Sequence, residues 1–194
     1  MKSQFWDFFL HLIIKFLFIF AKKTMQPKFP SESVTTLTDL VLPGETNPLN
    51  NLFGGELLAR MDRAASIAAR RHSRRITVTA SVNHVAFNRA IPLGSVVTVE
   101  AKVSRTFNSS MEIYIDVWTE DRESGIRTKA NEAIYTFVAV DETGRPVPVP
   151  PIVPETDLEK ERFAAALRRK QLSLVLAGKM KPSEATELKA LFMV

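Results

Sequence analysis

The feature that most constrains the fold is one long helical pattern followed by four strand-like runs. From about Gly54, apolar residues recur every three or four positions, which is the spacing of one buried helix face. These residues are Leu57, Leu58, Met61, Ala64, Ala65 and Ala68, while Arg60, Arg63, Arg70 and Arg71 lie off that face. β-branched residues then dominate four runs, at 76–87, 95–105, 111–120 and 128–140.

The four runs are typical of antiparallel strands with one buried face. Apolar and polar residues alternate from Val97 to Val103 and again from Met111 to Val117. The connectors are short and turn-like, as antiparallel neighbours allow. A further short strand is expected at 35–42, closed by a Pro-Gly turn. The order predicts an α+β fold in which a strongly curved antiparallel sheet wraps a long central helix.

Composition and proline placement divide the chain into three parts. With 194 residues, 45% hydrophobic and 24% charged, it resembles one globular domain with appendages. The domain is predicted at 25–154, where the Pro-rich end, 146–154, cannot form a central strand. Residues 155–194 predict a C-terminal helical tail, with a final short helix at 184–192.

The first 24 residues form an apolar extension with three possible interpretations. The run at 5–21 approaches the length of a bilayer span, but Asp7, His11 and Lys15 would share one helical face. No small-x-small cleavage site follows, so a cleaved signal peptide fits poorly. The segment could be a membrane anchor, an interfacial amphipathic helix or an upstream extension outside the native product. We favour the last, because Met25 opens an ordinary start that leads directly into the first strand.

Charge and cysteine content exclude several classes of function. Of the net charge of +5, residues 1–24 carry +3 (four basic, one acidic), which leaves +2 (22 basic, 20 acidic) for the rest. This near balance predicts no nucleic-acid partner. The absence of cysteine excludes disulfides, thiolate nucleophiles and Cys-based zinc sites. The three histidines lack ligand spacing, so no metal centre is expected. No cofactor is predicted for this chain.

A polar loop leads into the long helix, and together they carry the candidate catalytic side chains. Asn47 lies upstream of the helix N-terminus, whose free N–H groups suit a developing oxyanion. Asp62 lies two turns inside the helix among apolar neighbours, where an unpaired carboxylate is costly. The structural alternatives are a salt bridge to a nearby arginine for Asp62 and an ordinary turn amide for Asn47. Asn51 could cap the helix.

The two histidines outside the N-terminal extension are less suited to catalysis. His84 lies mid-strand and could act as a base, but no nucleophile or orienting acid lies at a recognisable spacing. His72 lies near the expected helix end. A structural role is favoured for both.

Several stretches together resemble one known family. They are TNPLNNLFGGELLARMD, ITVTASVNHVAFNRAIPLGSVV, SSMEIYIDVW and ANEAIYTFVAVDETGRPVPVPPIVPETDLEKERF. In this order they resemble the hotdog-fold acyl-CoA thioesterases of the cytosolic acyl-CoA hydrolase type, over roughly 37–163. One departure is Phe53, where many relatives have histidine before the Gly pair.

The resemblance implies hydrolysis of acyl-CoA to a free fatty acid and coenzyme A without a covalent intermediate. The family pair is an Asn in the loop and an acid on the helix, fifteen residues apart and from opposite chains, which Asn47 and Asp62 match. By this resemblance Asp62 orients or deprotonates the attacking water and Asn47 holds the water or the thioester. The amide of Gly55 would polarise the thioester carbonyl.

The resemblance also implies partners and a location. Coenzyme A phosphates are expected near the turn formed by Asn108, Ser109 and Ser110 and near basic residues such as Arg74, Arg105 or Lys129. The expected assembly is a homodimer that builds a trimer of dimers in the cytoplasm. The alternative is a non-catalytic hotdog module that binds acyl-CoA or lipid and is recruited to a membrane by the apolar run at 5–21.

Overall fold

The structure is a computed structural model that describes residues 25–121 and 124–192. The apolar run at 5–21 lies outside these residues, so its three interpretations stay open. Within the described ranges, no helix combines the length and apolar character needed to cross a membrane.

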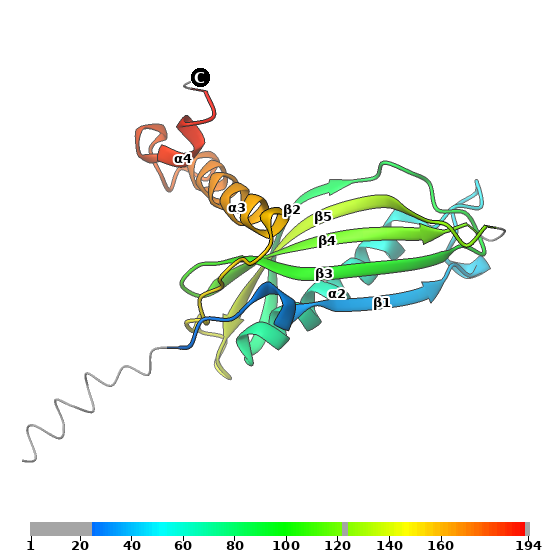
Figure 1. Ribbon diagram of the computed structural model, residues 1–194, viewed down its shortest axis with the longest axis horizontal. Helices are drawn as coiled ribbons and strands as arrows, with labels where there is room; N and C mark the ends of the chain where they lie inside the picture. The colour runs from blue at the N-terminus through cyan, green and yellow to red at the C-terminus, as the bar shows by residue number, and fades with distance from the viewer. Residues whose placement is uncertain (1–24, 122–123, 193–194) are drawn as a thin grey trace, which may run out of the picture.

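One antiparallel sheet of five strands, in the order β1-β3-β4-β5-β2, carries the long helix α2 across one face (Figure 1). The strands are β1 (Thr35–Leu40), β2 (Ile76–Ala86), β3 (Val96–Thr106), β4 (Ser110–Glu120) and β5 (Arg127–Val140). The helix α2 spans Gly54–Ser73. Short 3₁₀ turns lie at η1 (Pro30–Ser33), η2 (Pro43–Glu45) and η3 (Pro182–Glu184). This arrangement confirms the predicted α+β hotdog fold.

The core lies between α2 and the concave face of the sheet. Small side chains on α2, such as Ala65 and Ala68, are fully buried and let the helix approach the strands closely. The sheet contributes the odd-numbered residues of β4, including Ile113 and Ile115, which are also fully buried. The apolar face of α2, which has a period near 3.6 residues, therefore packs against the apolar face of the sheet, which has a period of 2.

Strand β2 forms one edge of the sheet and pairs only with β5. Its side chains are largely exposed, including those of the apolar residues Ile76, Val78 and Val82. Register shifts interrupt its pairing between Thr79 and Ser81 and again further along the strand. Such bulges bend a strand locally and redirect side chains.

The C-terminal tail docks on the other face of the sheet through charged groups. Helix α3 (Asp157–Leu176) begins at a capping box, in which Glu159 N donates to Thr156 Oγ1 at 3.2 Å. Arg162 and Arg169 of α3 pair with Asp116 and Glu112 of β4 at 2.9 and 2.7 Å. Helix α3 then leaves the sheet, with the short α4 (Thr186–Lys189) beside its outer end (Figure 1).

Two expectations about the C-terminal part had different outcomes. The Pro-rich segment 146–154 enters no named strand and makes only isolated bridges, as predicted. The last helix is shorter than the predicted 184–192, because a 3₁₀ turn precedes it and ends at Glu184.

Candidate active site

Asp62 of α2 and Thr79 of β2 form a hydrogen-bonded pair at the edge of the sheet. Thr79 Oγ1 donates to Asp62 Oδ1 at 2.8 Å. Asp62 is half-buried rather than a core residue, because its helix face points toward β2 and not into the alanine-lined core. Among the residues that the structure describes, no arginine pairs with Asp62, so the salt-bridge alternative is wrong. The carboxylate keeps an oxygen that Thr79 does not use.

Tyr135 of β5 lies close enough to Asp62 to feel its charge and is almost fully buried. Its hydroxyl donates to the carbonyl of Leu58 at 3.4 Å. Burial and the nearby negative charge of Asp62 raise the pKa of Tyr135 to about 12. Tyr135 is therefore neutral at physiological pH and adds no charge near the carboxylate.

Asn47 organises the loop before α2 through its side-chain carbonyl. Asn47 Oδ1 accepts from the backbone N–H groups of Leu49 and Asn51 at 2.9 and 3.2 Å. Because both donors are N–H groups, the atom facing them must be oxygen, and the two amide hydrogens of Asn47 are directed elsewhere. The turn role foreseen as an alternative is present, and it leaves a donor for another partner.

The N-terminus of α2 is open. Phe53 is the N-cap residue and provides no side-chain cap, so the expectation that Asn51 caps the helix is wrong. Asn51 instead donates its backbone N–H to Asn47 within the loop. The N–H groups of the first turn, including that of Gly55, lack intrahelical acceptors. Gly55 therefore lies in the first turn of α2, where it was expected.

Two aromatic rings lie against the Gly pair. A Cβ added at Gly55 would meet Phe53 Cε1 at 2.8 Å, so residue 55 has no room for a side chain while that ring is in place. A Cβ at Gly54 would meet the ring of Phe87 at 3.7 Å. Phe53 and Phe87 are both more than half exposed, and they form apolar walls beside the open helix N-terminus.

Asn47 and Asp62 share no hydrogen bond among the described residues. Asn47 accepts from two N–H groups of its own loop, which is closed by a bridge between Thr46 and Leu52. Asp62 accepts from Thr79 of β2. The two candidate groups therefore have separate partners within one chain.

The residues expected to bind coenzyme A fall at two ends of the sheet. Ser110 pairs with Val138 and Trp118 pairs with Lys129, so Lys129 lies eight positions along β4 from the turn, about 26 Å away. Lys129 is also engaged by Asp116 and Glu132, at 2.8 and 2.6 Å. The structure separates Lys129 from the turn with which it was grouped.

Arg105 is also engaged in a structural contact. Its guanidinium lies 4.0 Å from the ring centre of Phe163 and donates to the carbonyl of that residue at 2.8 Å. Arg74, Asn108, Ser109 and Ser110 lie at one end of the sheet, since the Ser109 carbonyl accepts from Ala139, which pairs with the start of β2. Their role in binding coenzyme A stays a prediction.

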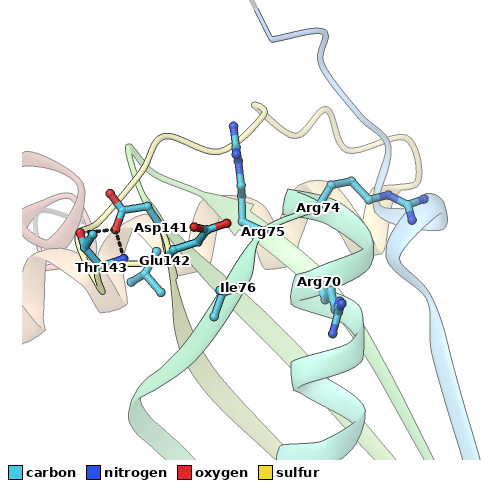
Figure 2. Close-up of a pocket in the computed structure, with 8 residues that line it drawn as sticks. Arg70, Arg74, Arg75, Ile76, Asp141, Glu142 and Thr143 are labelled. Atoms are coloured by element: carbon cyan, nitrogen blue, oxygen red, sulfur yellow. Dashed lines mark hydrogen bonds between the residues drawn. The ribbon is translucent and has the colours of Figure 1, made fainter.

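A surface hollow of about 760 Å³ lies where the end of α2 meets the start of β2 and the end of β5. It is lined by Arg70, Arg74, Arg75, Ile76, Val140, Asp141, Glu142 and Thr143. Figure 2 shows the three arginine side chains pointing in different directions, and the two acidic residues lie on the opposite wall. The hollow therefore does not present a convergent set of cations for a phosphate.

The two described histidines differ in their surroundings. His72 is fully buried at the end of α2 and bonds the carbonyl of Pro150 at 2.8 Å through Nε2, a structural contact. His84 is exposed on β2. Within residues 25–121 and 124–192, no three His, Asp or Glu side chains gather in a way that could hold a metal ion.

Two neighbours of Asp62 were missed from the sequence. Thr79 is one of many threonines in a strand, and Tyr135 lies 73 positions after Asp62. The available signal for Thr79 was its position on the first strand after the helix, where the chain reverses and returns beside Asp62. The sequence does not show which residue of β2 lies opposite Asp62, so this position alone could not select Thr79 over Thr77.

Comparisons with known proteins point to one family. Residues 49–126 match the Thioesterase superfamily. An uncharacterized acyl-CoA thioester hydrolase of Bacillus subtilis is 42% identical over 147 residues, 76% of this chain and 86% of that protein. The crystal structure of an apo hexameric acyl-CoA thioesterase superposes with a TM-score of 0.76 at 38% identity, covering 79% of this chain and 98% of that one.

An acyl-CoA hydrolase from Staphylococcus aureus is similar as well. Its complex with butyryl coenzyme A, coenzyme A and coenzyme A disulfide has a TM-score of 0.72 at 33% identity, covering 84% of this chain and 98% of that one. Alanine variants of that enzyme have been characterised at an aspartate at position 43, a threonine at position 60 and an asparagine at position 28. The sequence identity, the shared sheet and helix, and the length covered together place this chain in the family of hotdog-fold acyl-CoA thioesterases.

Proposed function

We propose that this protein hydrolyses acyl-CoA thioesters to a free fatty acid and coenzyme A at a site formed by two copies of the chain. One copy supplies Asp62 with Thr79, and the other supplies Asn47 and the helix N-terminus at Gly55. The observation that carries the proposal is the Thr79 to Asp62 hydrogen bond of 2.8 Å beside an open sheet edge.

The spacing of residues supports this assignment. In the S. aureus hydrolase, the three positions studied as alanine variants, 28, 43 and 60, are separated by 15 and 17 residues. The same intervals separate Asn47 from Asp62 and Asp62 from Thr79 in this chain. The side-chain types also agree at all three positions.

The sheet edge supports a two-chain site. Strand β2 is eleven residues long and leaves one side of its backbone unpaired in the described chain. Exposed apolar side chains such as Val78 and Val82 accompany this edge. Open apolar edges favour pairing with another strand, and a second β2 would bring a partner chain beside Asp62 and Thr79. Hexameric relatives support further assembly of such dimers into a trimer of dimers.

In the proposed reaction, residues of the two copies of the chain perform every step. Thr79 orients the Asp62 carboxylate, which accepts a proton as the water oxygen bonds to the thioester carbonyl carbon. The N–H of Gly55 and the amide N–H of Asn47 stabilise the oxyanion of the tetrahedral intermediate. The C–S bond then breaks, and the proton on Asp62 passes to the coenzyme A sulfur. No cofactor is required.

Measurement of thiol release from acyl-CoA tests the proposal. Asp62→Ala and Asn47→Ala should each lower turnover by at least about a hundredfold while keeping the fold, the range expected for a general base or an oxyanion donor. Wild-type rates in either variant would overturn the site. A series of acyl chain lengths on the wild-type protein then defines the substrate.

Mixed oligomers test the two-chain arrangement directly. If Asp62→Ala and Asn47→Ala chains are unfolded together and refolded, dimers with one chain of each kind contain one intact site. Activity should therefore reappear in the mixture although both parents are inactive. A mixture as inactive as its parents would contradict a shared site.

The rival function is a binding module that holds acyl-CoA or lipid without hydrolysing it. Such a module has no need of a carboxylate oriented by a threonine, or of a free amide in the loop before an open helix N-terminus. Binding of acyl-CoA without thiol release would favour the rival. The proposed location for the enzyme is the cytoplasm, with membrane association only through the segment at 5–21.

A further inference from the structure

Arg60 is a buried charged residue that ties α2 to the loop of Asn47. Only 4% of its side chain is exposed, although its position lies off the apolar face of the helix. Arg60 Nη2 lies 2.8 Å from both carboxylate oxygens of Glu45 and donates to the carbonyl of Leu40 at 3.2 Å. Arg60 precedes Asp62 by two residues, and Glu45 precedes Asn47 by two. One ion pair thus connects the segments that carry the two candidate groups.

Glu45 joins the two ends of the loop before α2. Its Oε2 accepts from the backbone N–H of Leu42 at 2.9 Å, and its own carbonyl accepts from Phe53 N at 2.8 Å. The Leu42 and Arg60 hydrogen bonds both lower the pKa of the Glu45 carboxyl, with the Leu42 bond as the larger cause. Glu45 is therefore ionised at physiological pH, when it can hold the guanidinium. The hydrogen bonds of Asn47 to Leu49 and Asn51 lie inside the loop that Glu45 closes.

Burial of the Arg60 guanidinium at this position reduces the stability of the fold. Within the described residues, Arg60 Nε and Nη1 are buried and have no hydrogen-bond partner. Groups that lose water without gaining a partner reduce stability, and an apolar side chain of similar length avoids that loss. Packing alone would favour methionine over arginine at residue 60. What methionine lacks is the link to Glu45.

We propose that the Arg60–Glu45 ion pair is a positioning device for Asn47. It holds the loop against α2. The free amide hydrogens of Asn47 then keep a fixed position relative to the N–H of Gly55 at the start of the same helix. Arg60 and Glu45 touch no substrate and act only through Asn47. The inference rests on the proposed function, because it assumes that Asn47 acts on the thioester.

Three variants and one control test the device. Glu45→Gln keeps the shape and the acceptor for Leu42 but removes the charge; Arg60→Met removes the guanidinium and leaves Glu45, which is 26% exposed, in contact with water. Arg60→Lys retains a cation. The control is Asp39→Asn, because Asp39 is 63% exposed and lies 3.6 Å from the same Arg60 nitrogen but outside the loop.

The expected signature is a loss of kcat without a matching loss of stability. Glu45→Gln and Arg60→Met should each lower kcat about tenfold, since small displacements of a positioned group are costly. The KM should stay within about twofold and the Tm of Arg60→Met should not fall, because the unpaired buried donors are removed. Arg60→Lys should recover part of the lost kcat, and Asp39→Asn should match wild type. Unchanged kcat in both Glu45→Gln and Arg60→Met overturns the inference.

A double-mutant cycle with Asn47→Ala separates positioning from a general structural role. If Glu45 acts through Asn47, adding Glu45→Gln to Asn47→Ala causes no further loss of kcat. A multiplied loss in the double variant overturns the inference while leaving the proposed function intact. If Asn47→Ala alone keeps wild-type turnover, the proposed function itself fails. The two failures are therefore distinguishable in one experiment.

Discussion

Thr79 Oγ1 lies 2.8 Å from Asp62 Oδ1 and joins the edge strand β2 to the middle of helix α2. The register shift immediately after Thr79 accompanies the point where this side chain meets the helix. The pair fixes the direction of one carboxylate oxygen beside the open side of β2. This one contact between a strand and a helix therefore sets the position and the orientation of the Asp62 carboxylate and leaves it close to the open edge of the sheet.

Removing the Thr79 hydroxyl should impair turnover. Thr79→Val has nearly the same shape but cannot donate to Asp62, so we expect kcat to fall about tenfold as the carboxylate loses its orientation. Thr79→Ser retains a hydroxyl and should recover most of the rate. Steady-state thiol release measures both. Thr77→Val, on the same strand but without a contact to Asp62, serves as the control, and an equal loss there would contradict a specific role for Thr79.

A methyl group at Gly55 should reduce activity without reducing stability. Gly55→Ala places a Cβ 2.8 Å from the Phe53 ring, which must move beside the N–H proposed to stabilise the oxyanion. We expect kcat to fall about tenfold, while the Tm is maintained because alanine favours a helix more than glycine does.

A second substitution and a control identify the cause. Phe53→Ala combined with Gly55→Ala removes the clash and should restore part of the rate. Gly44→Ala, where a Cβ meets no atom within 4 Å, should behave as wild type. If the double variant were slower than Gly55→Ala alone, the collision with Phe53 would not explain the loss.

A charge on the edge of the sheet should prevent dimer formation. Val82 is 48% exposed on β2, and Val82→Lys places an ammonium where a second β2 would pair. We expect a smaller species by light scattering coupled to size-exclusion chromatography, together with loss of turnover. Val153→Lys is the matched control, since Val153 is 44% exposed in the Pro-rich segment and its backbone bonds Lys28 rather than β2. Unchanged mass and activity in Val82→Lys would exclude β2 as the interface.

Stability should decrease at mildly acidic pH because of His72. Burial, as the largest cause, lowers the pKa of His72 below its usual value of 6.5, and the nearby charge of Lys28 acts in the same direction. The unfolded chain then binds a proton near pH 6.5 that the folded chain does not, so protonation favours unfolding. We expect the Tm to fall as the pH drops below about 6.5.

The contribution of His72 can be isolated by substitution. His72→Gln retains an N–H that can donate to the Pro150 carbonyl, which Nε2 of His72 contacts at 2.8 Å, but it does not titrate. The decline of Tm between pH 6.5 and pH 5 should therefore be shallower in this variant. Differential scanning calorimetry across that range measures it, and identical slopes in both proteins would assign the decline to other groups.

Much of the architecture could be predicted because its signals are local. The 3.6-residue period that begins at Gly54 and the alternation in β3 and β4 each reflect burial on one side of a single element. The sequence was less informative where a contact joins two elements. Asn51 does not cap α2, because its backbone is used by Asn47. The register of β4 against β5 places Lys129 at the opposite end of the sheet from the turn at Ser110 within one chain, and its part in binding coenzyme A stays a prediction.

The sequence by itself determined the long helix, the strands and their order, since periodicity is read along one chain, and its resemblance to a known family suggested pairing Asn47 with Asp62. Only the tertiary structure decided what Asp62 meets, namely Thr79 rather than an arginine. It also decided that Arg60 is buried against Glu45 and that β2 is left as an exposed edge. The physical reason is that hydrogen bonds and ion pairs between distant residues depend on strand register and helix placement, which no local pattern specifies.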